Sequence, residues 1–265
     1  MTRSIDRTPA NLTRNDMTHR IDESQRKAAR IAGVAFLFAI AIVVFGNFYV
    51  LADIVVAGNA AETARNIIAH ETRFRLSMVC NLLHVAGVAV LLSALYVILE
   101  PVNRSLALAA AFCRLIFAVI WGVTALNTLS ALRLLGHGLY GHTPYLNVFG
   151  ADQLQALARL NITGAFDAYY AGLPFFALAS TICSYLWFKS GYIPRVLAAF
   201  GFAASAWCVV CAFVFLVFPS FNDTVNIWWF DTPMGLFEIA LGFWLLFKGL
   251  RSSGMAETVP VGDRA

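Results

Sequence analysis

Two charged side chains, Arg114 and Glu238, lie within long apolar stretches of this sequence and are its first candidates for chemistry. An ionisable side chain inside a membrane span is costly to desolvate. Such a residue therefore either pairs with a buried partner or belongs to a functional site. One interpretation is an ion pair that holds helices together, and the other is a substrate or proton site. The sequence leaves both open.

The depths of these two charges predict that they meet. Arg114 lies ten residues after Arg104, and Glu238 lies ten residues before Lys248. Both basic residues mark ends of spans on the same side of the membrane. At about 1.5 Å per helical residue, each charge is roughly 15 Å from that boundary, near the bilayer centre. We therefore expect an intramembrane ion pair.

A second set of polar side chains predicts a pocket that opens toward the opposite, outer side. Its members are Asn47, Asn81, His84, Asp167 and Tyr170, which converge if the first, second and fourth spans are neighbours. His84 suits a ligand, a base or a hydrogen-bonded packing residue. Metal sites need three or four ligands, and no second intramembrane histidine accompanies His84. No metal and no other cofactor are therefore expected.

The elements that must position these residues are transmembrane helices. The 265-residue chain is 60% hydrophobic and 13% charged, with a mean hydropathy of +0.71. A soluble domain has about 45–50% apolar and about 25% charged residues, and one span needs about 20 apolar residues. We predict an all-α, polytopic bundle of about six spans. The expected spans are Ala28–Leu51, Leu76–Leu99, Leu106–Leu129, Ala165–Phe188, Val196–Phe218 and Thr232–Phe247, with interfacial helices over Ala60–Arg73 and Asp152–Leu160.

Lys and Arg are distributed unevenly between the two sides and predict the orientation. Seven of the 19 lie in the first 30 residues. Counted over loops and tails, 13 fall on the side of the N-terminus and five on the other side. We expect both termini in the cytoplasm. Residues 1–27 are expected to be a disordered basic arm, residues 28–251 the membrane domain, and residues 252–265 a disordered tail.

Short motifs in a fixed order resemble a known family. They are Arg30-Ile31-Ala32-Gly33, Phe74-Arg75-Leu76, Pro101-Val102-Asn103-Arg104, Cys113-Arg114-Leu115, the segment Lys189–Arg195, and the last span from Glu238 to Gly249. Together they resemble the bacterial membrane family DUF4386, a domain of unknown function, over about Arg26–Arg251. The resemblance implies a bacterial inner-membrane protein and no particular activity. It departs at Asn81, where many relatives are expected to carry Asp.

Three functions remain as alternatives. The first is a non-enzymatic bundle that binds or moves a small or lipophilic ligand, because polar residues occur in the spans without a catalytic motif. The second is an intramembrane enzyme that acts on a lipid, with His84 and Asp167 as acid and base. The third is a structural or regulatory partner of another membrane protein. The expected partners are the lipid bilayer and a lipophilic ligand. Nucleic-acid binding has no support, since basic and aromatic residues mix only at membrane boundaries.

Overall fold

The computed structural model describes residues 21–139 and 144–251, and within these ranges the chain is helical and contains no strand. The prediction of an all-α bundle is confirmed. In chain order the elements are α1 (Glu23–Val44), η1 (Phe45–Val50), α2 (Ala60–Ala69), α3 (Glu71–Leu99), α4 (Arg104–Leu134), η2 (Pro144–Val148), α5 (Ala151–Ser190), α6 (Arg195–Val217), α7 (Phe221–Thr224) and α8 (Ile227–Phe247).

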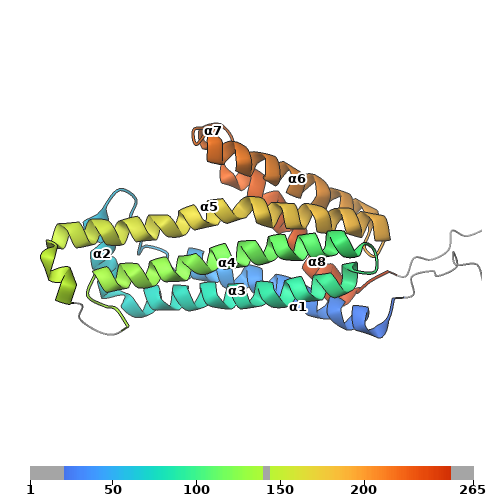
Figure 1. Ribbon diagram of the computed structural model, residues 1–265, viewed down its shortest axis with the longest axis horizontal. Helices are drawn as coiled ribbons and strands as arrows, with labels where there is room; N and C mark the ends of the chain where they lie inside the picture. Colours follow the sequence, from blue (N-terminus) through green and yellow to red (C-terminus); the bar gives the residue numbers. More distant parts are fainter. Residues whose placement is uncertain (1–20, 140–143, 252–265) are drawn as a thin grey trace, which may run out of the picture.

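Six of these helices are long and apolar enough to cross a membrane: α1 with η1, α3, α4, α5, α6 and α8. They pack as a closed ring in which neighbours follow the order α1, α3, α4, α5, α6, α8 and back to α1. Figure 1 shows α1, α3, α4 and α5 running along the long axis, while α6 and α8 cross it obliquely. Both ends of the described chain emerge at the same end of the bundle. The ring lets side chains from non-neighbouring helices meet in its interior.

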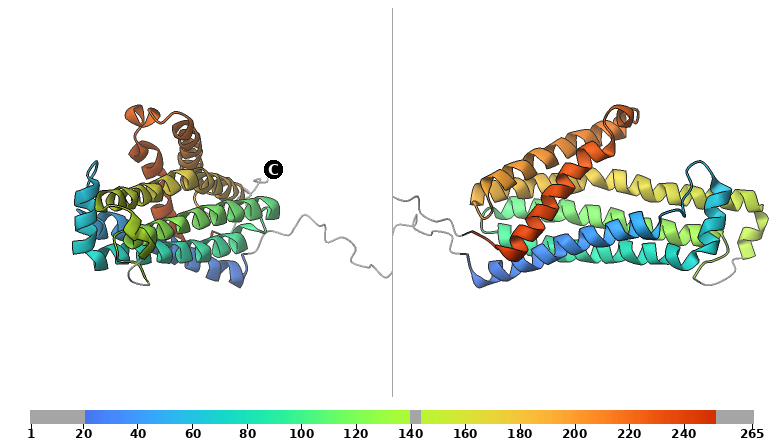
Figure 2. Two further views of the ribbon diagram at one scale, coloured as in Figure 1. Left: turned by 60° about the vertical axis from the view of Figure 1, so that its left-hand side comes forward. Right: turned by 180° about the vertical axis from the view of Figure 1, so that it is seen from behind.

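The ring closes between α1 and α8 through very close backbone approach, which Figure 2 shows as an oblique crossing. A Cβ atom added to Gly33 would lie 2.7 Å from the amide nitrogen of Leu246 and 2.8 Å from the carbonyl oxygen of Gly242. Only a residue without a side chain fits there, since small residues let membrane helices pack at short range.

Helix boundaries differ from the expected ones at both ends of the domain. α1 begins at Glu23, inside the segment expected to be a disordered arm, because Asp22 and Gln25 form a capping box. Residues 1–20 and 252–265 lie outside the described residues. α8 begins at Ile227, capped by the side chain of Asn226, so Trp228, Trp229 and Asp231 belong to the span and not to the preceding loop.

The two expected interfacial helices have different outcomes. α2 is a separate short helix, capped by Asn59 and ending before His70. The segment Asp152–Leu160, in contrast, is the first part of the 40-residue helix α5. No proline interrupts α5 before Pro174, so the interfacial segment and the fourth span are one continuous helix.

Candidate functional site

The ring interior holds the Arg114–Glu238 pair that the depth argument places together. A guanidinium nitrogen of Arg114 lies 2.9 Å from a carboxylate oxygen of Glu238. The same nitrogen donates to the hydroxyl of Ser180 at 2.8 Å, and Ser180 lies 3.3 Å from the same carboxylate oxygen. Arg114 is 3% exposed and Glu238 is 5% exposed. Three spans, α4, α5 and α8, are therefore joined at one buried polar point.

Two aromatic rings lie close to the Arg114 guanidinium. Its central carbon lies 4.9 Å from the centroid of the Phe176 ring and 5.7 Å from that of Phe36. Both distances suit a cation–π interaction, which is strongest where water is excluded. The charge of Arg114 is thus balanced by a carboxylate and by two rings. These contacts fit the interpretation of Arg114 and Glu238 as an ion pair that holds helices together.

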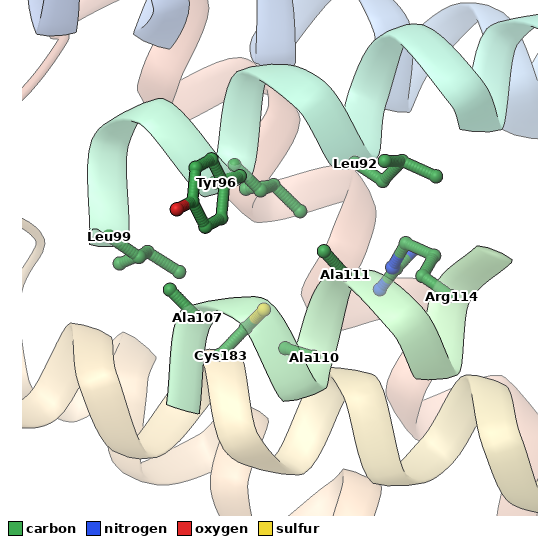
Figure 3. A pocket seen from close by; sticks show the side chains of 9 residues that line it. Leu92, Tyr96, Leu99, Ala107, Ala110, Ala111, Arg114 and Cys183 are labelled. Atoms are coloured by element: carbon green, nitrogen blue, oxygen red, sulfur yellow. The ribbon is translucent and has the colours of Figure 1, made fainter. Parts of the chain in front are cut away.

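A small cavity of about 10 Å³ adjoins Arg114 between α3, α4 and α5. Figure 3 shows Arg114 at one end of this cavity and Tyr96 and Leu99 toward the other. Cys183 and three alanines complete most of its wall. A volume of this size holds about one water molecule, so the cavity has no room for an organic ligand.

A chain of aromatic side chains continues from Phe117, one turn from Arg114, away from the end of the bundle where the described chain enters and leaves. The half of the ring farther from that end is called the outer half below. The centroid of the Trp121 ring lies 5.6 Å from that of Phe117, 5.0 Å from that of His84 and 5.5 Å from that of Tyr169. His84 donates its Nδ1–H to the carbonyl oxygen of Ala39 on α1 at 2.9 Å. A carbonyl oxygen can only accept, so in the neutral ring Nε2 carries the lone pair.

Several polar atoms in this outer half have no hydrogen-bond partner among the described residues. They are Nε2 of His84, Nε1 of Trp121 and Oδ1 of Asn81, and all three side chains are buried. Unpaired buried polar groups are rare in native proteins. Nε of Arg114 also lacks a hydrogen-bond partner among the described residues, so what distinguishes the centre from this half is its ion pair.

The structure adds Asp231 and Tyr169, which the sequence reasoning missed. The hydroxyl of Tyr169 donates to a carboxylate oxygen of Asp231 at 2.7 Å, linking α5 to α8. Within the described ranges, no basic side chain forms an ion pair with Asp231. The available signal was the seven-residue spacing between Asp231 and Glu238, which places both on one helix face once the span starts at Ile227.

The five residues of the predicted outer pocket occupy different environments. Asn47 lies in the π-helical η1 and donates to the carbonyl oxygen of Val43, one turn earlier in its own helix. Asn81 and His84 are buried inside the ring. Asp167 is exposed, and Tyr170 is half-buried with its ring 4.6 Å from that of Phe215. His84 and Asp167, the acid–base pair of the enzyme alternative, therefore do not share one environment.

A groove runs along the outside of the ring between α1 and α3. Its volume is about 480 Å³, and its walls are apolar except for Arg30 at one end. Gly87 forms part of the floor, where a Cβ atom would lie 3.1 Å from the Phe38 ring. The other lining residues are Ile31, Val34 and Ala35 on α1 and Leu83, Ala86 and Val90 on α3.

The described residues contain no group of three or more His, Cys, Asp or Glu side chains that could hold a metal ion. The family model for domain of unknown function DUF4386 matches residues 31–249, which covers most of the first span and the other five spans in full. No curated protein matches the chain. No solved structure matches it either.

Proposed function

The chain belongs to the DUF4386 family, and we propose that it is a non-enzymatic membrane protein that binds a lipophilic ligand in the groove between α1 and α3. The observation that carries the proposal is the groove itself, which has about 480 Å³ of space and apolar walls. Ligand sites typically enclose about 300–1,000 Å³. The groove is thus large enough for a chain-like apolar molecule, whereas the cavity beside Arg114 is not.

The walls of the groove fit a flexible hydrocarbon chain. Val34 is 54% exposed, Ile31 49% and Val90 50%, so the groove opens toward the surrounding bilayer. A lipid tail could enter sideways from the membrane without passing a polar barrier. Gly87 deepens the floor, since any side chain there would press on Phe38. We infer that the ligand comes from the bilayer and carries at least one acyl or alkyl chain.

We further propose that the protein lies in a bacterial cytoplasmic membrane with both termini in the cytoplasm. In this orientation the Arg30 end of the groove is in the cytoplasmic leaflet. The support is the bias of basic residues, because Arg104, Lys189, Arg195 and Lys248 all lie at the bundle end where the described chain enters and leaves. Positive charge is enriched on the cytoplasmic side of membrane proteins.

The two other functions have less support. An enzyme using His84 and Asp167 would need both groups at one substrate, but His84 is buried in the ring and Asp167 is exposed on α5. A structural partner of another membrane protein would cover a lipid-facing surface. The groove is a concave part of that surface with a single charge at its end. We favour a lipid for this site.

Filling the groove tests the proposal. Val34→Trp places a large ring in the groove, while Val119→Trp puts the same ring on the lipid-facing surface of α4, where Val119 is 64% exposed. A lipid carrying a photoreactive group in its acyl chain should label peptides of α1 and α3 in the unmodified protein. Val34→Trp should reduce that labelling about tenfold, equivalent to about 1.4 kcal/mol of lost affinity, and Val119→Trp should leave it unchanged. Equal labelling of all lipid-facing helices in all three proteins would contradict the proposal.

A further inference from the structure

Resting on the proposed function, we propose that the groove selects a phospholipid of net negative charge, whose phosphate pairs with the guanidinium of Arg30. Among the described residues, Arg30 is the only charged one that lines the groove, and it lies at one end of it. The next lining residue, Ile31, begins the apolar wall. This order of one cation followed by an apolar channel matches a lipid, which has an anionic head followed by a hydrocarbon tail.

Arg30 is available for such a partner. Its side chain is exposed, and within residues 21–139 and 144–251 it forms no ion pair. Its neighbour Lys27 differs, because the ammonium of Lys27 lies 2.7 Å from a carboxylate oxygen of Glu23. The positive charge of Arg30 is therefore not cancelled by a protein carboxylate in the described part of the chain.

The depth of Arg30 suits a headgroup. Arg30 lies seven residues after the start of α1 at Glu23, which corresponds to about 10 Å along the helix. A long basic side chain near a helix end extends its charged group toward the membrane surface while its methylenes cover apolar surface. The guanidinium therefore reaches headgroup level while the groove continues into the hydrocarbon region.

The chemistry of the guanidinium favours a phosphate. Its parallel N–H groups bind phosphate oxygens in a bidentate manner. A zwitterionic lipid carries a phosphate as well, but its own ammonium competes for that phosphate. A lipid with net negative charge lacks this competing cation, and anionic lipids are also attracted to basic segments at the cytoplasmic surface. The groove should therefore select lipids by the charge of the headgroup as well as by the hydrocarbon tail.

The test is lipid retention by the purified full-length protein, measured by native mass spectrometry. The protein is equilibrated in detergent with equal amounts of phosphatidylglycerol and phosphatidylcholine that carry the same acyl chains. The unmodified protein should retain phosphatidylglycerol about fivefold over phosphatidylcholine, as expected for one basic group near an anionic headgroup. Arg30→Gln should bring this ratio to about one while leaving phosphatidylcholine retention unchanged.

Arg26→Gln is the matched control, because Arg26 is exposed on α1 one turn before Arg30 but does not line the groove. It should keep most of the preference. If Arg26→Gln abolishes the preference as fully as Arg30→Gln, the selectivity belongs to the general basic surface and the inference is wrong. Arg30→Lys should keep an intermediate ratio, since an ammonium retains the charge but loses the bidentate geometry.

The outcomes separate the inference from the proposed function. Equal retention of the two lipids by the unmodified protein, with both lost in Val34→Trp, overturns the headgroup assignment and leaves the groove as a lipid site. Undiminished retention of both lipids by Val34→Trp overturns the proposed function. A lipid-free dimer that protects the α1 and α3 faces overturns both, because a second copy would then occupy the groove.

Discussion

Arg114 and His84 are both buried polar side chains inside the same ring, yet their surroundings differ. Arg114 bonds to Glu238 and Ser180 and contacts two aromatic rings. His84 bonds to one backbone carbonyl and has no charged partner, and its Nε2, like Nε of Arg114, has no hydrogen-bond partner among the described residues. A buried charge without an oppositely charged partner lowers the stability of the fold by several kcal/mol. A neutral imidazole with one unpaired nitrogen lowers it by less. Stability should therefore depend strongly on the centre and weakly on the outer half.

The largest expected effect comes from breaking the central pair. Arg114→Leu leaves the Glu238 carboxylate buried without its cation, and Glu238→Leu leaves the guanidinium without its anion. Each should lower the free energy of unfolding by about 3–5 kcal/mol. The double substitution should recover much of that loss, because two leucines leave no buried charge. Unfolding by sodium dodecyl sulfate in mixed micelles, followed by circular dichroism, measures all three.

If the double substitution lowers the free energy of unfolding by the sum of the two single losses, the comparison between the centre and the outer half fails. It would mean that the two side chains stabilise the ring independently, Arg114 through its contacts with Phe36 and Phe176, and not as a pair. The coupling energy from the double-mutant cycle is the decisive quantity, since distant, independent sites add and paired sites do not.

The sequence contained enough information to predict this central pair and the class of fold. Long uncharged runs are nearly sufficient to identify spans, because each must cross the hydrocarbon core. A charge in a span must also find a partner at its own depth, so counting from Arg104 and Lys248 placed Arg114 and Glu238 at one level. The depth of a residue in a span follows from counting residues along the helix. It can therefore be predicted without knowing which helices are neighbours.

The outer half could not be predicted in the same way, because it depends on the order of helices around the ring. Asn47 lies in a π-helical segment that no residue pattern predicted, and its side chain donates to a carbonyl of its own helix. Asp231 lies just outside the expected span Thr232–Phe247, because the start of α8 is set by the Asn226 cap and not by hydropathy. The groove depends on how closely α1 approaches α3 at Gly87 and Phe38. Spans that are hydrophobic all round carry little information about which face meets which neighbour.

An intermediate effect is expected where the outer half does hold a charge. Tyr169→Phe removes the hydroxyl that donates to Asp231 and keeps the ring that packs on Trp121. Hydrogen bonds to charged groups contribute about 1.5–3 kcal/mol when buried, and Asp231 is only half-buried. We therefore expect a loss of about 1–2 kcal/mol in the same unfolding assay.

Tyr170→Phe is the matched control for Tyr169→Phe. It removes the neighbouring hydroxyl from a half-buried ring that packs on Phe215. Its effect should lie within about 0.5 kcal/mol of zero. If the two substitutions lower the free energy of unfolding equally, the Tyr169–Asp231 hydrogen bond contributes nothing specific to stability. The Asp231 carboxylate would then be stabilised by solvent alone.

The smallest effect, and the sharpest test of the contrast with Arg114, is expected for His84→Leu. The substitution removes one hydrogen bond to the carbonyl of Ala39, an oxygen that can also accept from the backbone within α1. It simultaneously removes the unpaired Nε2 atom and its desolvation cost. Both terms are about 1 kcal/mol and have opposite signs, so stability should change by less than about 1 kcal/mol. A loss above about 2 kcal/mol would mean that Nε2 binds a group that stabilises the folded protein. The outer half would then hold a polar group on which stability depends strongly, and the difference between the two regions would disappear.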